Sequence, residues 1–483
     1  MLSRIQLENF QGYLGKHTVE LGQITLIFGA NASGKSSIGR AIKLVGQSFL
    51  EYETGKPLAF KYSGKQVDLG SYKRAVFSDL WSSDERKAAD WDSKLGIELT
   101  FDCSGNSDLR DLGIDEVSLR IEELISEGDS GSEQISKANL TLTNRASGVT
   151  VQIPSDFLLS NEIAIDFDNP VVRKMFGIPD FLIHFEDGWS TGELWQAMSS
   201  GSERKYIFGF PRFDEEDLNS FADFDDPDYQ QMVEFGMAYN RVLLTAMLEI
   251  HHVFYGLNSI APIRAVPARA EFEPRRPEHS AERIAFANNW LLELTESRYE
   301  LEVSLTETYD QKTYVIERAI KDKFTGASPS FDELGTGLSQ VLPIILGVFN
   351  LDVDGIPELD NEPTVNQTIY IEQPELHLHP KMQAEVASML HASLSITRNQ
   401  LLVETHSENI LLRLQKLIRT GQMPKDQLRV VFTEGIPREP FETGTSGQPG
   451  FNRMENIDLD SSGDLLDPLP TSFAALRVQE ILG

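Results

Sequence analysis

Apolar and polar residues alternate in a regular way near the N-terminus. Residues 5–10 and 17–21 alternate between the two kinds of side chain, which predicts a small hairpin of two strands. Residues 21–28 (LGQITLIF) are mostly apolar, as in a short buried strand, and residues 37–45 have the apolar spacing of a helix. We therefore expect a hairpin, then a buried strand, a connecting loop and a helix.

The same kinds of pattern recur after residue 95. Short apolar or alternating stretches predict strands at 97–101, 140–142, 149–153, 299–305, 314–316, 368–372 and 400–404. Apolar residues at helical spacing predict helices at 229–255, 341–349, 380–396 and 408–419. Strands that alternate with helices, as they do in the C-terminal part, favour a parallel sheet.

From these elements we predict an α/β fold with a mostly parallel sheet that carries helices on both faces. The N-terminus and residues 299–320 would add an antiparallel β portion. Residues 1–105 and 255–435 would form the two parts of one domain, and residues 436–483 a C-terminal extension. Residues 106–254, rich in Ser, Asp and Gly before the long helix, would be an inserted, mainly helical lid or interaction region.

Composition changes this picture little, but it restricts the partners. The chain has 483 residues, of which 40% are hydrophobic and 24% charged, as is ordinary for a soluble protein. Its apolar runs are too short to span a bilayer, and the single cysteine, Cys103, excludes a disulfide framework. We expect a cytoplasmic protein without a membrane partner. The net charge of −31 argues against a surface that grips nucleic acid throughout.

Two charged segments keep local partners possible. The acidic run at 214–229 could bind a basic partner, and a solvated loop is the alternative. The segment 263–283 is basic and rich in proline, so it is a candidate contact for phosphate or nucleic acid. Pairing of its arginines with neighbouring carboxylates is the other interpretation. These arginines are Arg264, Arg269, Arg275, Arg276 and Arg283.

The most specific motif lies between the buried strand and the first helix. Residues 29–36 (GANASGKS) fit the pattern G-x-x-x-x-G-K-[ST], the P-loop. In this motif backbone N–H groups surround a phosphate, the lysine reaches the β- and γ-phosphates, and the serine hydroxyl ligates Mg²⁺. The sequence therefore predicts a P-loop NTPase. The expected nucleotide contacts are Gly29, Asn31, Ser33, Gly34, Lys35, Ser36 and Ser37, with Ser36 also a metal ligand.

Three later segments place further polar groups at the ends of strands and helices. Glu372 ends an apolar strand, where the Mg²⁺ of a nucleotide would lie. His406 follows the next strand, from where its ring can reach a γ-phosphate. The start of an apolar helix offers backbone N–H groups to phosphate oxygens. Its candidate residues are Gly335, Gly337, Ser339 and Gln340.

In this order the segments resemble the ABC-type ATPase superfamily, and in particular its head-only branch with RecF, SMC heads and the overcoming-lysogenisation-defect (OLD) ATPases. The resemblance covers 1–105 and 255–483 and extends to a bacterial subfamily of stand-alone ATPases found in defence systems, whereas 106–254 matches no segment of it. The segments that carry the resemblance are 7–10, the P-loop, 68–72, 260–264, 335–340, 371–380, 404–408 and 457–460.

The resemblance implies roles for the candidate residues. Lys35 and Ser36 would be the Walker A contacts, Glu372 the Walker B carboxylate and His406 the switch histidine. Residues 335–340 would be the signature, which in such ATPases serves the nucleotide of a partner chain. ATP and Mg²⁺ are then the cofactors, and two chains would enclose two ATP molecules in a homodimer or a larger assembly.

One position departs from the general pattern. The residue after the Walker B acid is usually a carboxylate, but here it is Gln373. An amide cannot accept a proton at neutral pH, although it can position a water molecule. We expect slow hydrolysis by a tuned switch, or reliance on Glu375, His377 or His406. An inactive ATPase is the alternative.

The resemblance leads to two main hypotheses for the cellular role. The first is the ATPase subunit of a bacterial anti-phage system that controls a separate effector, such as a nuclease. OLD proteins carry a C-terminal Toprim nuclease, whereas the acidic residues at 458–467 are typical of a solvated loop. The second is a RecF-like DNA-repair ATPase that binds DNA through its dimer. A nucleotide-locked scaffold with negligible turnover is a third possibility.

Overall fold

The computed structural model describes residues 1–52, 58–77, 94–128, 131–155, 165, 169–177, 205–207, 210–212, 227–264, 270–273, 281–307, 314–351, 366–436 and 451–466. The chain divides into two compact units. The first comprises the described residues of Met1–Val19, Ser37–Tyr255 and Pro437–Asn452, and the second those of Glu20–Ser36, Gly256–Ile436 and Arg453–Gly483. Among the described residues, none of the helices has the length and apolar character required to cross a membrane.

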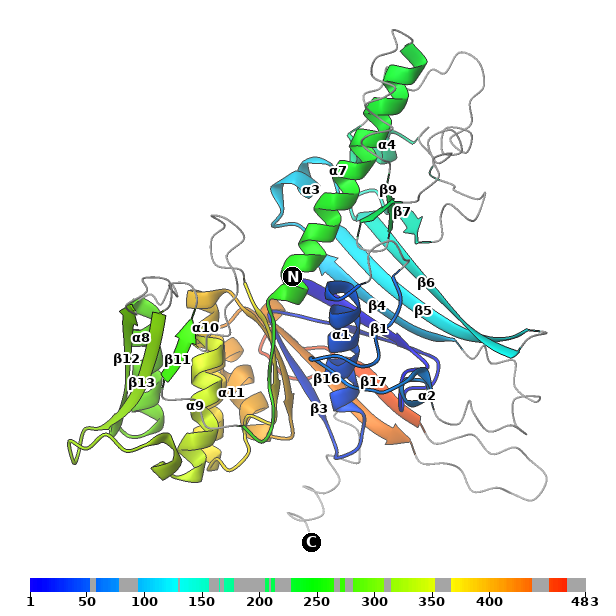
Figure 1. The fold of residues 1–483 in the computed structure, drawn as a ribbon. Helices are drawn as coiled ribbons and strands as arrows, with labels where there is room; N and C mark the ends of the chain where they lie inside the picture. Colours follow the sequence, from blue (N-terminus) through cyan, green and yellow to red (C-terminus); the bar gives the residue numbers. More distant parts are fainter. Residues whose placement is uncertain are drawn as a thin grey trace, which may run out of the picture. The chain divides into compact units, whose positions relative to one another are not determined.

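The first unit is built on a six-stranded antiparallel sheet (Figure 1). Its strands, in spatial order, are β2 (Lys16–Glu20), β1 (Leu2–Glu8), β4 (Leu95–Asp102), β5 (Glu116–Gly128), β6 (Gly131–Asn144) and β7 (Val149–Pro154). Alternation is clear in β4 and β5, where Leu99 pairs with Leu119 and Ile97 with Ile121, and all four are fully buried. One face of these strands therefore forms the core of the unit.

Helices complete the first unit, together with the two-stranded sheet of β8 (Lys205–Ile207) and β9 (Phe210–Arg212). They are α1 (Lys35–Leu50), α2 (Tyr72–Ala75), α3 (Ser107–Asp111), α4 (Pro170–Phe176) and α7 (Pro227–Tyr255). Phe254 of α7 packs against Phe49 of α1 and Phe101 of β4, each at 5.6 Å between ring centroids. Aromatic packing therefore ties the C-terminal end of the long helix to the sheet.

The segment 106–254 differs from the expected lid. Its first part, 116–154, forms β5, β6 and β7, which extend the sheet begun by β1 and β4. β6 and β7 contain the strands that we expect at 140–142 and 149–153, and α7 contains the helix that we expect at 229–255. The boundary at residue 105 falls between the paired strands β4 and β5. The cause is that the polar residues of β5 and β6 give this segment a loop-like composition, although Val117, Leu119 and Ile121 are fully buried.

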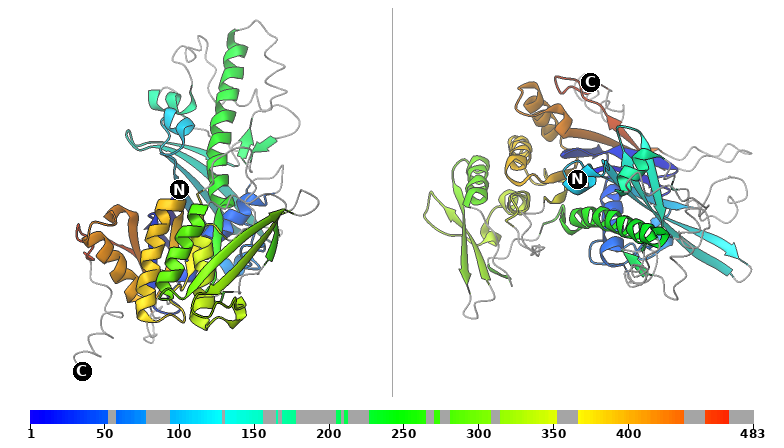
Figure 2. Two further views of the ribbon diagram at one scale, coloured as in Figure 1. Left: turned by 90° about the vertical axis from the view of Figure 1, so that its left-hand side faces the viewer. Right: turned by 90° about the horizontal axis from the view of Figure 1, so that it is seen from above.

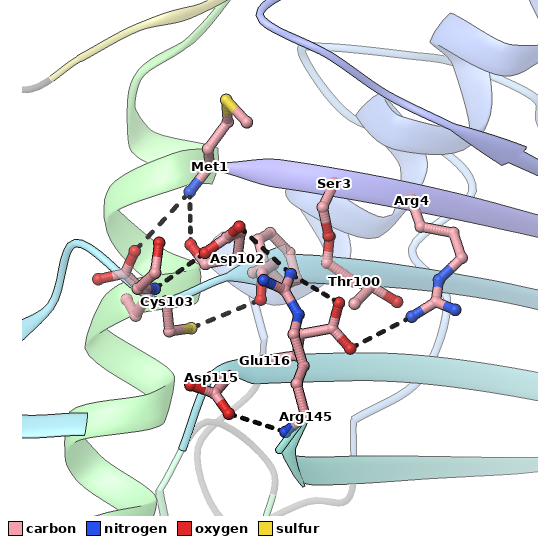
Figure 3. Close-up of polar contacts among 12 residues, drawn as sticks. Met1, Ser3, Arg4, Thr100, Asp102, Cys103, Asp115, Glu116 and Arg145 are labelled. Atoms are coloured by element: carbon pink, nitrogen blue, oxygen red, sulfur yellow. Dashed lines mark hydrogen bonds and ion pairs between the residues drawn. The ribbon is translucent and has the colours of Figure 1, made fainter. Parts of the chain in front are cut away.

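A network of polar contacts joins the ends of β1, β4 and β5 near the N-terminus (Figure 3). The amino group of Met1 donates to the backbone oxygen of Asp102 at 3.1 Å, and Arg145 bonds Asp102 and Glu116 at 3.2 and 2.8 Å. Cys103 is fully buried beside these residues, and burial raises the pKa of its thiol to about 12. It is therefore a packing residue and not a reactive thiolate.

The second unit contains a six-stranded sheet with a parallel centre. Its strands are β10 (Leu257–Ile260), β14 (Thr368–Glu372), β15 (Gln400–Thr405), β3 (Ile24–Gly29), β16 (Leu428–Ile436) and β17 (Phe451–Ile457). Each pair from β10 to β16 is parallel. The carboxyl ends of β14, β15, β3 and β16 therefore meet at one edge, which is where α/β sheets bind ligands.

Four helices lie on one side of this sheet; the last three in chain order lie against it, and the first packs on two of the others and on β12 (Tyr299–Glu307) (Figures 1 and 2). They are α8 (Ala281–Leu294), α9 (Thr336–Val348), α10 (Pro380–Thr397) and α11 (Glu408–Arg419), accompanied by the short 3-10 helices Phe331–Glu333 and Lys425–Gln427. The apolar core between helices and sheet includes Leu26 of β3, Ile345 of α9 and Leu414 of α11. Residues of the opposite face, such as Leu402 and Val431, are buried as well.

The sequence predicts that residues 299–320 form one antiparallel β portion with the N-terminal strands, but the structure places them in a different sheet. They form β12 (Tyr299–Glu307) and most of β13 (Tyr314–Asp322), which pair with each other and with β11 (Ala270–Glu273) in a separate three-stranded antiparallel sheet. This small sheet belongs to the second unit, and α8 lies against β12 through Asn288, whose side chain bonds both backbone groups of Leu301.

Candidate functional site

The P-loop connects the buried strand β3 to α1. All six residues of β3 are buried, so the strand fixes where the loop begins. A Cβ atom at Gly29 would lie 2.2 Å from the backbone oxygen of Thr433 on β16, and Gly34 has a φ of +92°. Only glycine meets both constraints without strain, which explains the two fixed glycines of the motif.

A hydroxyl pair holds the loop against β16. Ser33 Oγ and Thr433 Oγ1 are 2.6 Å apart, both buried, and Thr433 Oγ1 also donates to the oxygen of Phe28 at 3.2 Å. Asn31, by contrast, is exposed at the tip of the loop. The structure therefore separates the predicted loop residues into an anchored side chain and an exposed one that can meet a ligand.

Lys35 starts α1 and is buried. Its ammonium group donates to the oxygens of Gly29 and Ala30 at 3.0 and 2.7 Å. Burial lowers the pKa of Lys35, and the negative charges of Glu404 and Glu375 oppose that effect. The ammonium group thus lies among the loop carbonyls, and a phosphate in the loop would offer it charged acceptors in their place.

The hydroxyl of Ser36 meets a carboxylate from β15. Ser36 Oγ donates to Glu404 Oε1 at 2.9 Å, and the Tyr370 hydroxyl donates to Glu404 Oε2 at 3.0 Å. Glu404 is the register partner of Glu372 on the neighbouring strand, and paired residues of parallel strands project from the same face. Two carboxylates therefore end adjacent strands beside the P-loop serine.

Glu375 positions the segment that carries His406. Its two carboxylate oxygens accept hydrogen bonds from the His406 backbone N–H at 2.7 Å and from Thr405 Oγ1 at 2.8 Å. Burial, followed by the charge of Lys35, lowers the pKa of His406 against the opposing effects of Glu375, Glu404 and the backbone of Gly29. Within the described part of the chain, the buried Nε2 atom has no hydrogen-bond partner.

Arg264 links the start of α9 to the turn that follows β14 (the β14 turn, residues 373–379). Its Nη2 atom donates to the oxygens of Glu372 and Gln373 at 2.8 and 3.0 Å, and its Nη1 atom to the oxygen of Gln340 at 3.3 Å. The Gln340 side chain in turn accepts from the Arg264 backbone N–H at 3.2 Å. Burial lowers the pKa of Arg264 to about 10, despite Glu375 and Glu372. The sequence leaves two roles open for this arginine, a contact for phosphate or nucleic acid and pairing within the protein. Arg264 is bonded within the protein, but to backbone carbonyl groups and not to carboxylates.

The predicted signature begins α9. Gly335 is the N-cap residue and is exposed, and a Cβ atom there would have no neighbour within 4 Å. Ser339 Oγ donates to the oxygen of Thr336. In the described residues, no hydrogen bond joins residues 335–340 to the P-loop. The space at Gly335 shows that folding of this chain alone does not require glycine at this position.

The β14 turn contains the position at which the general pattern has a carboxylate. Gln373 has a φ of +46°, a left-handed conformation that is costly for a residue other than glycine. Its backbone N–H donates to the oxygen of Glu404 at 2.7 Å. The turn is therefore held from both sides, by the end of β15 and by Arg264.

The chemistry of this edge suits a magnesium nucleotide. Mg²⁺ prefers oxygen ligands and usually takes one or two carboxylates together with substrate phosphates. Ser36, Glu372 and Glu404 offer such oxygens, whereas the described residues hold no group of three His, Cys, Asp or Glu side chains that could bind a metal without a nucleotide. The acidic run at 214–226 and the arginines at 269, 275 and 276 lie outside the described residues.

Two family models match separate parts of the chain. The model described as an AAA ATPase domain matches residues 275–411, which include Glu372 and His406, and the model described as an AAA domain matches residues 4–61, which include the P-loop. Each match covers less than half of the chain, and together they include the P-loop and the ends of β14 and β15. With the P-loop and the parallel sheet, the chain has the α/β fold of a P-loop ATPase.

Known proteins resemble the chain more loosely. An SMC head bound to the C-winged helix domain of ScpA has a TM-score of 0.44 at 13% identity, covering 95% of this chain and 98% of that one. The SMC head with an extended coiled coil from Pyrococcus furiosus has a TM-score of 0.42 at 14% identity, covering 100% and 99%. Arcadin-4 of Pyrobaculum calidifontis is 46% identical over 81 residues, which are 16% of this chain and 10% of that protein.

Sequence reasoning missed residues that bond the P-loop, among them Glu404 and Thr433. Glu404 and Thr433 bond Ser36 and Ser33, which lie 368 and 400 positions earlier in the chain. A signal for Glu404 was present, because QLLVE at 400–404 ends an apolar run in glutamate as TIYIE does at 368–372. Thr433 lies inside an ordinary strand and has no such signal.

Proposed function

We propose that this protein binds ATP with Mg²⁺ and hydrolyses it slowly, as a nucleotide-driven dimeric switch. The observation that carries the proposal is the bond of the P-loop serine to Glu404 at the end of β15, where Glu372 is the register partner on β14 and His406 follows. Lys35 would bind the β- and γ-phosphates, and Ser36 and Glu372 would hold Mg²⁺. The metal would neutralise charge that develops on the transferred phosphate.

Slow hydrolysis follows from the residue after Glu372. Gln373 can orient a water molecule but cannot take its proton, and its left-handed backbone is held by the bonds from Arg264 and to Glu404. His406, with a lowered pKa and an unpaired buried Nε2 atom, is suited to contact the γ-phosphate as a neutral ring. We infer that the ATP-bound state is long-lived, because hydrolysis is slow.

A second copy of the chain is the proposed partner of the signature. The exposed start of α9 presents backbone N–H groups at a helix N-terminus, which favours an anion. Open space at Gly335 would let a phosphate or another chain come close. Two chains would then share two nucleotides, and loss of the γ-phosphate on hydrolysis would release them.

For the cellular role, we propose the ATPase subunit of a bacterial anti-phage system that controls a separate effector such as a nuclease. This rests on the resemblance described above. The RecF-like alternative has weaker support, because the net charge is −31 and Arg264 is buried and bonded within the protein.

The test compares the wild type with Lys35→Ala. ATP binding should weaken on the order of 10- to 100-fold, because hydrogen bonds to charged groups contribute about 1.5–3 kcal/mol. Sedimentation with ATP and with ADP should show an ATP-dependent dimer in the wild type alone. Equal ATP binding by both proteins would contradict the nucleotide site.

The cellular role needs a separate experiment. Cells that express the protein with its neighbouring genes should form fewer phage plaques, and Lys35→Ala should remove the protection. Salt-dependent DNA binding by the isolated protein, without such protection, would favour the repair function.

A further inference from the structure

We propose that Glu404 is a positioning residue that orients the Ser36 hydroxyl toward the magnesium ion of the nucleotide. The inference rests on the proposed function, since it concerns the same metal. It assigns to β15 a carboxylate that acts through the P-loop serine, in addition to Glu372 on β14.

The geometry that carries this inference is a chain of three side chains. Tyr370 donates its hydroxyl proton to Glu404 Oε2 at 3.0 Å, and Ser36 donates its own to Glu404 Oε1 at 2.9 Å. Tyr370 and Glu404 are buried, with exposed fractions of 2% and 4%. Both carboxylate oxygens therefore have a fixed donor, and the carboxylate has one orientation.

The direction of the Ser36 bond decides what the serine can offer. A hydroxyl has one proton and two lone pairs. When the proton points to Glu404, the lone pairs of Oγ point away from that carboxylate and are available to a cation. A carboxylate acceptor also strengthens this bond over one to a neutral acceptor, so Glu404 raises the electron density on the oxygen that would ligate Mg²⁺.

The strand order explains why β15 supplies this group. β15 lies between β3, which leads into the P-loop, and β14, which ends in Glu372. Residues 404 and 372 are register partners, and residue 404 also pairs with Ile27 of β3. β15 is thus one of the two strands that flank β3, and a carboxylate at its end reaches Ser36 directly.

Such outer partners of a metal ligand have a measurable effect. Their removal typically costs 10- to 100-fold in metal affinity. In Glu404→Gln the amide keeps the size of the side chain but loses the charge, and its NH₂ group cannot accept from Tyr370. We expect Mn²⁺ to bind the complex of protein and ADP about 10- to 100-fold more weakly in Glu404→Gln, while ADP without metal binds as in the wild type.

The experiment titrates Mn²⁺ into the full chain with saturating ADP and follows the electron paramagnetic resonance signal of free Mn²⁺. Tyr370→Phe, which leaves Glu404 bonded to Ser36 alone, should weaken Mn²⁺ binding in the same direction by a smaller factor. Glu385→Gln is the matched control, because it also removes one carboxylate of this unit, at an ion pair with Arg413 on α10 and α11. Its Mn²⁺ affinity should equal that of the wild type.

A double-mutant cycle distinguishes an effect of Glu404 through the Ser36 hydroxyl from a direct effect of its negative charge on the metal ion. If Glu404 acts through the serine, Glu404→Gln should add nothing to the loss already caused by Ser36→Ala. Additive losses, or wild-type Mn²⁺ affinity in both Glu404→Gln and Tyr370→Phe, would overturn the inference and leave the ATPase proposal intact. If the wild type fails to bind ADP with and without Mn²⁺, the proposed function itself is wrong, and the inference falls with it.

Discussion

Two arginines, the half-buried Arg120 and the buried Arg264, show how differently the two units use charge. Arg120, in the antiparallel sheet of the first unit, bonds Glu8, Glu98 and Glu122 with its three guanidinium nitrogens. Arg264, in the second unit, bonds only carbonyl oxygens, and its Nε atom has no partner among the described residues. The charge of Arg120 is therefore paired with carboxylates. The charge of Arg264 is not paired in this way and lies at the turn that follows β14.

The pKa values respond in opposite directions. Burial would lower the pKa of Arg120, but the bonds and charges of Glu122 and Glu8 raise it above its ordinary value. Burial lowers the pKa of Arg264 to about 10, because Glu375 and Glu372 compensate only in part. Complete pairing is typical of a structural ion cluster, and incomplete pairing beside a strained turn is typical of a functional site. The comparison predicts that removal of Arg120 lowers stability, whereas removal of Arg264 lowers ATP turnover.

The largest effect should be the loss of stability in Arg120→Ala. Removing one partner of a buried ion pair costs about 3–5 kcal/mol, and here three carboxylates would be left together with Lys94, which bonds Glu122 at 2.5 Å. Urea denaturation should show this loss. ADP binding by the folded protein should stay at the wild-type level, and weakened ADP binding in proportion to the stability loss would break the comparison.

Arg264→Ala should reverse that pattern. Without the guanidinium group, the β14 turn and the start of α9 lose their common anchor, and a shift of about 1 Å at such a site can cost on the order of 100-fold in rate. ATP turnover should fall by about that factor while ADP binding changes little.

Arg264→Lys provides the control for charge. A lysine keeps the positive charge but cannot reproduce the planar fork of donors, so its turnover should stay near that of Arg264→Ala. Near wild-type turnover in Arg264→Lys would mean that the charge matters and the geometry does not. Wild-type turnover in Arg264→Ala would remove this arginine from the site.

Much of the fold follows from the periodicity of the sequence, but the pairing of its strands does not. The strand expected at 21–28 and the helix at 37–45 correspond to β3 and α1. Alternation in 299–305 shows that the strand has one buried face, yet it does not say which sheet receives that face. The structure pairs this strand with β13 and not with the N-terminal strands, a choice set by contacts between distant segments.

The candidate site has the same limit. Motif spacing singles out Lys35 and Ser36, because the loop that they close is local in sequence. Glu404 reaches Ser36 from 368 positions away, and Arg264 bonds carbonyl groups, which carry no side-chain signal. Residue type singles out the candidate ligand contacts, and only the folded sheet shows which residues hold them in place.

Gln373→Glu tests the turn that Arg264 holds, and its expected effect on ATP turnover is smaller. A carboxylate in the turn held by Arg264 could accept the proton of the attacking water, a role that contributes about 100- to 10,000-fold where geometry is ideal. Because the turn is shaped around an amide, we expect a gain of roughly 10-fold in ATP turnover. Gln373→Ala should lower turnover instead. An unchanged or lower rate in Gln373→Glu would show that hydrolysis relies on another group.

The smallest effect concerns His406 and appears as a change with pH. Burial lowers its pKa in the folded protein, so the unfolded chain binds more protons once the pH falls below about 6.5, and stability decreases as the solution becomes more acidic. His406→Gln should flatten this decrease between about pH 7 and pH 5 in urea denaturation. His391→Gln should also flatten it, because burial lowers the pKa of His391 as well, yet only the change at His406, beside Lys35 and Gly29, should slow ATP turnover. Equal loss of turnover in both variants would mean that the unpaired nitrogen of His406 has no contact with the nucleotide, and that incomplete pairing does not by itself mark the site.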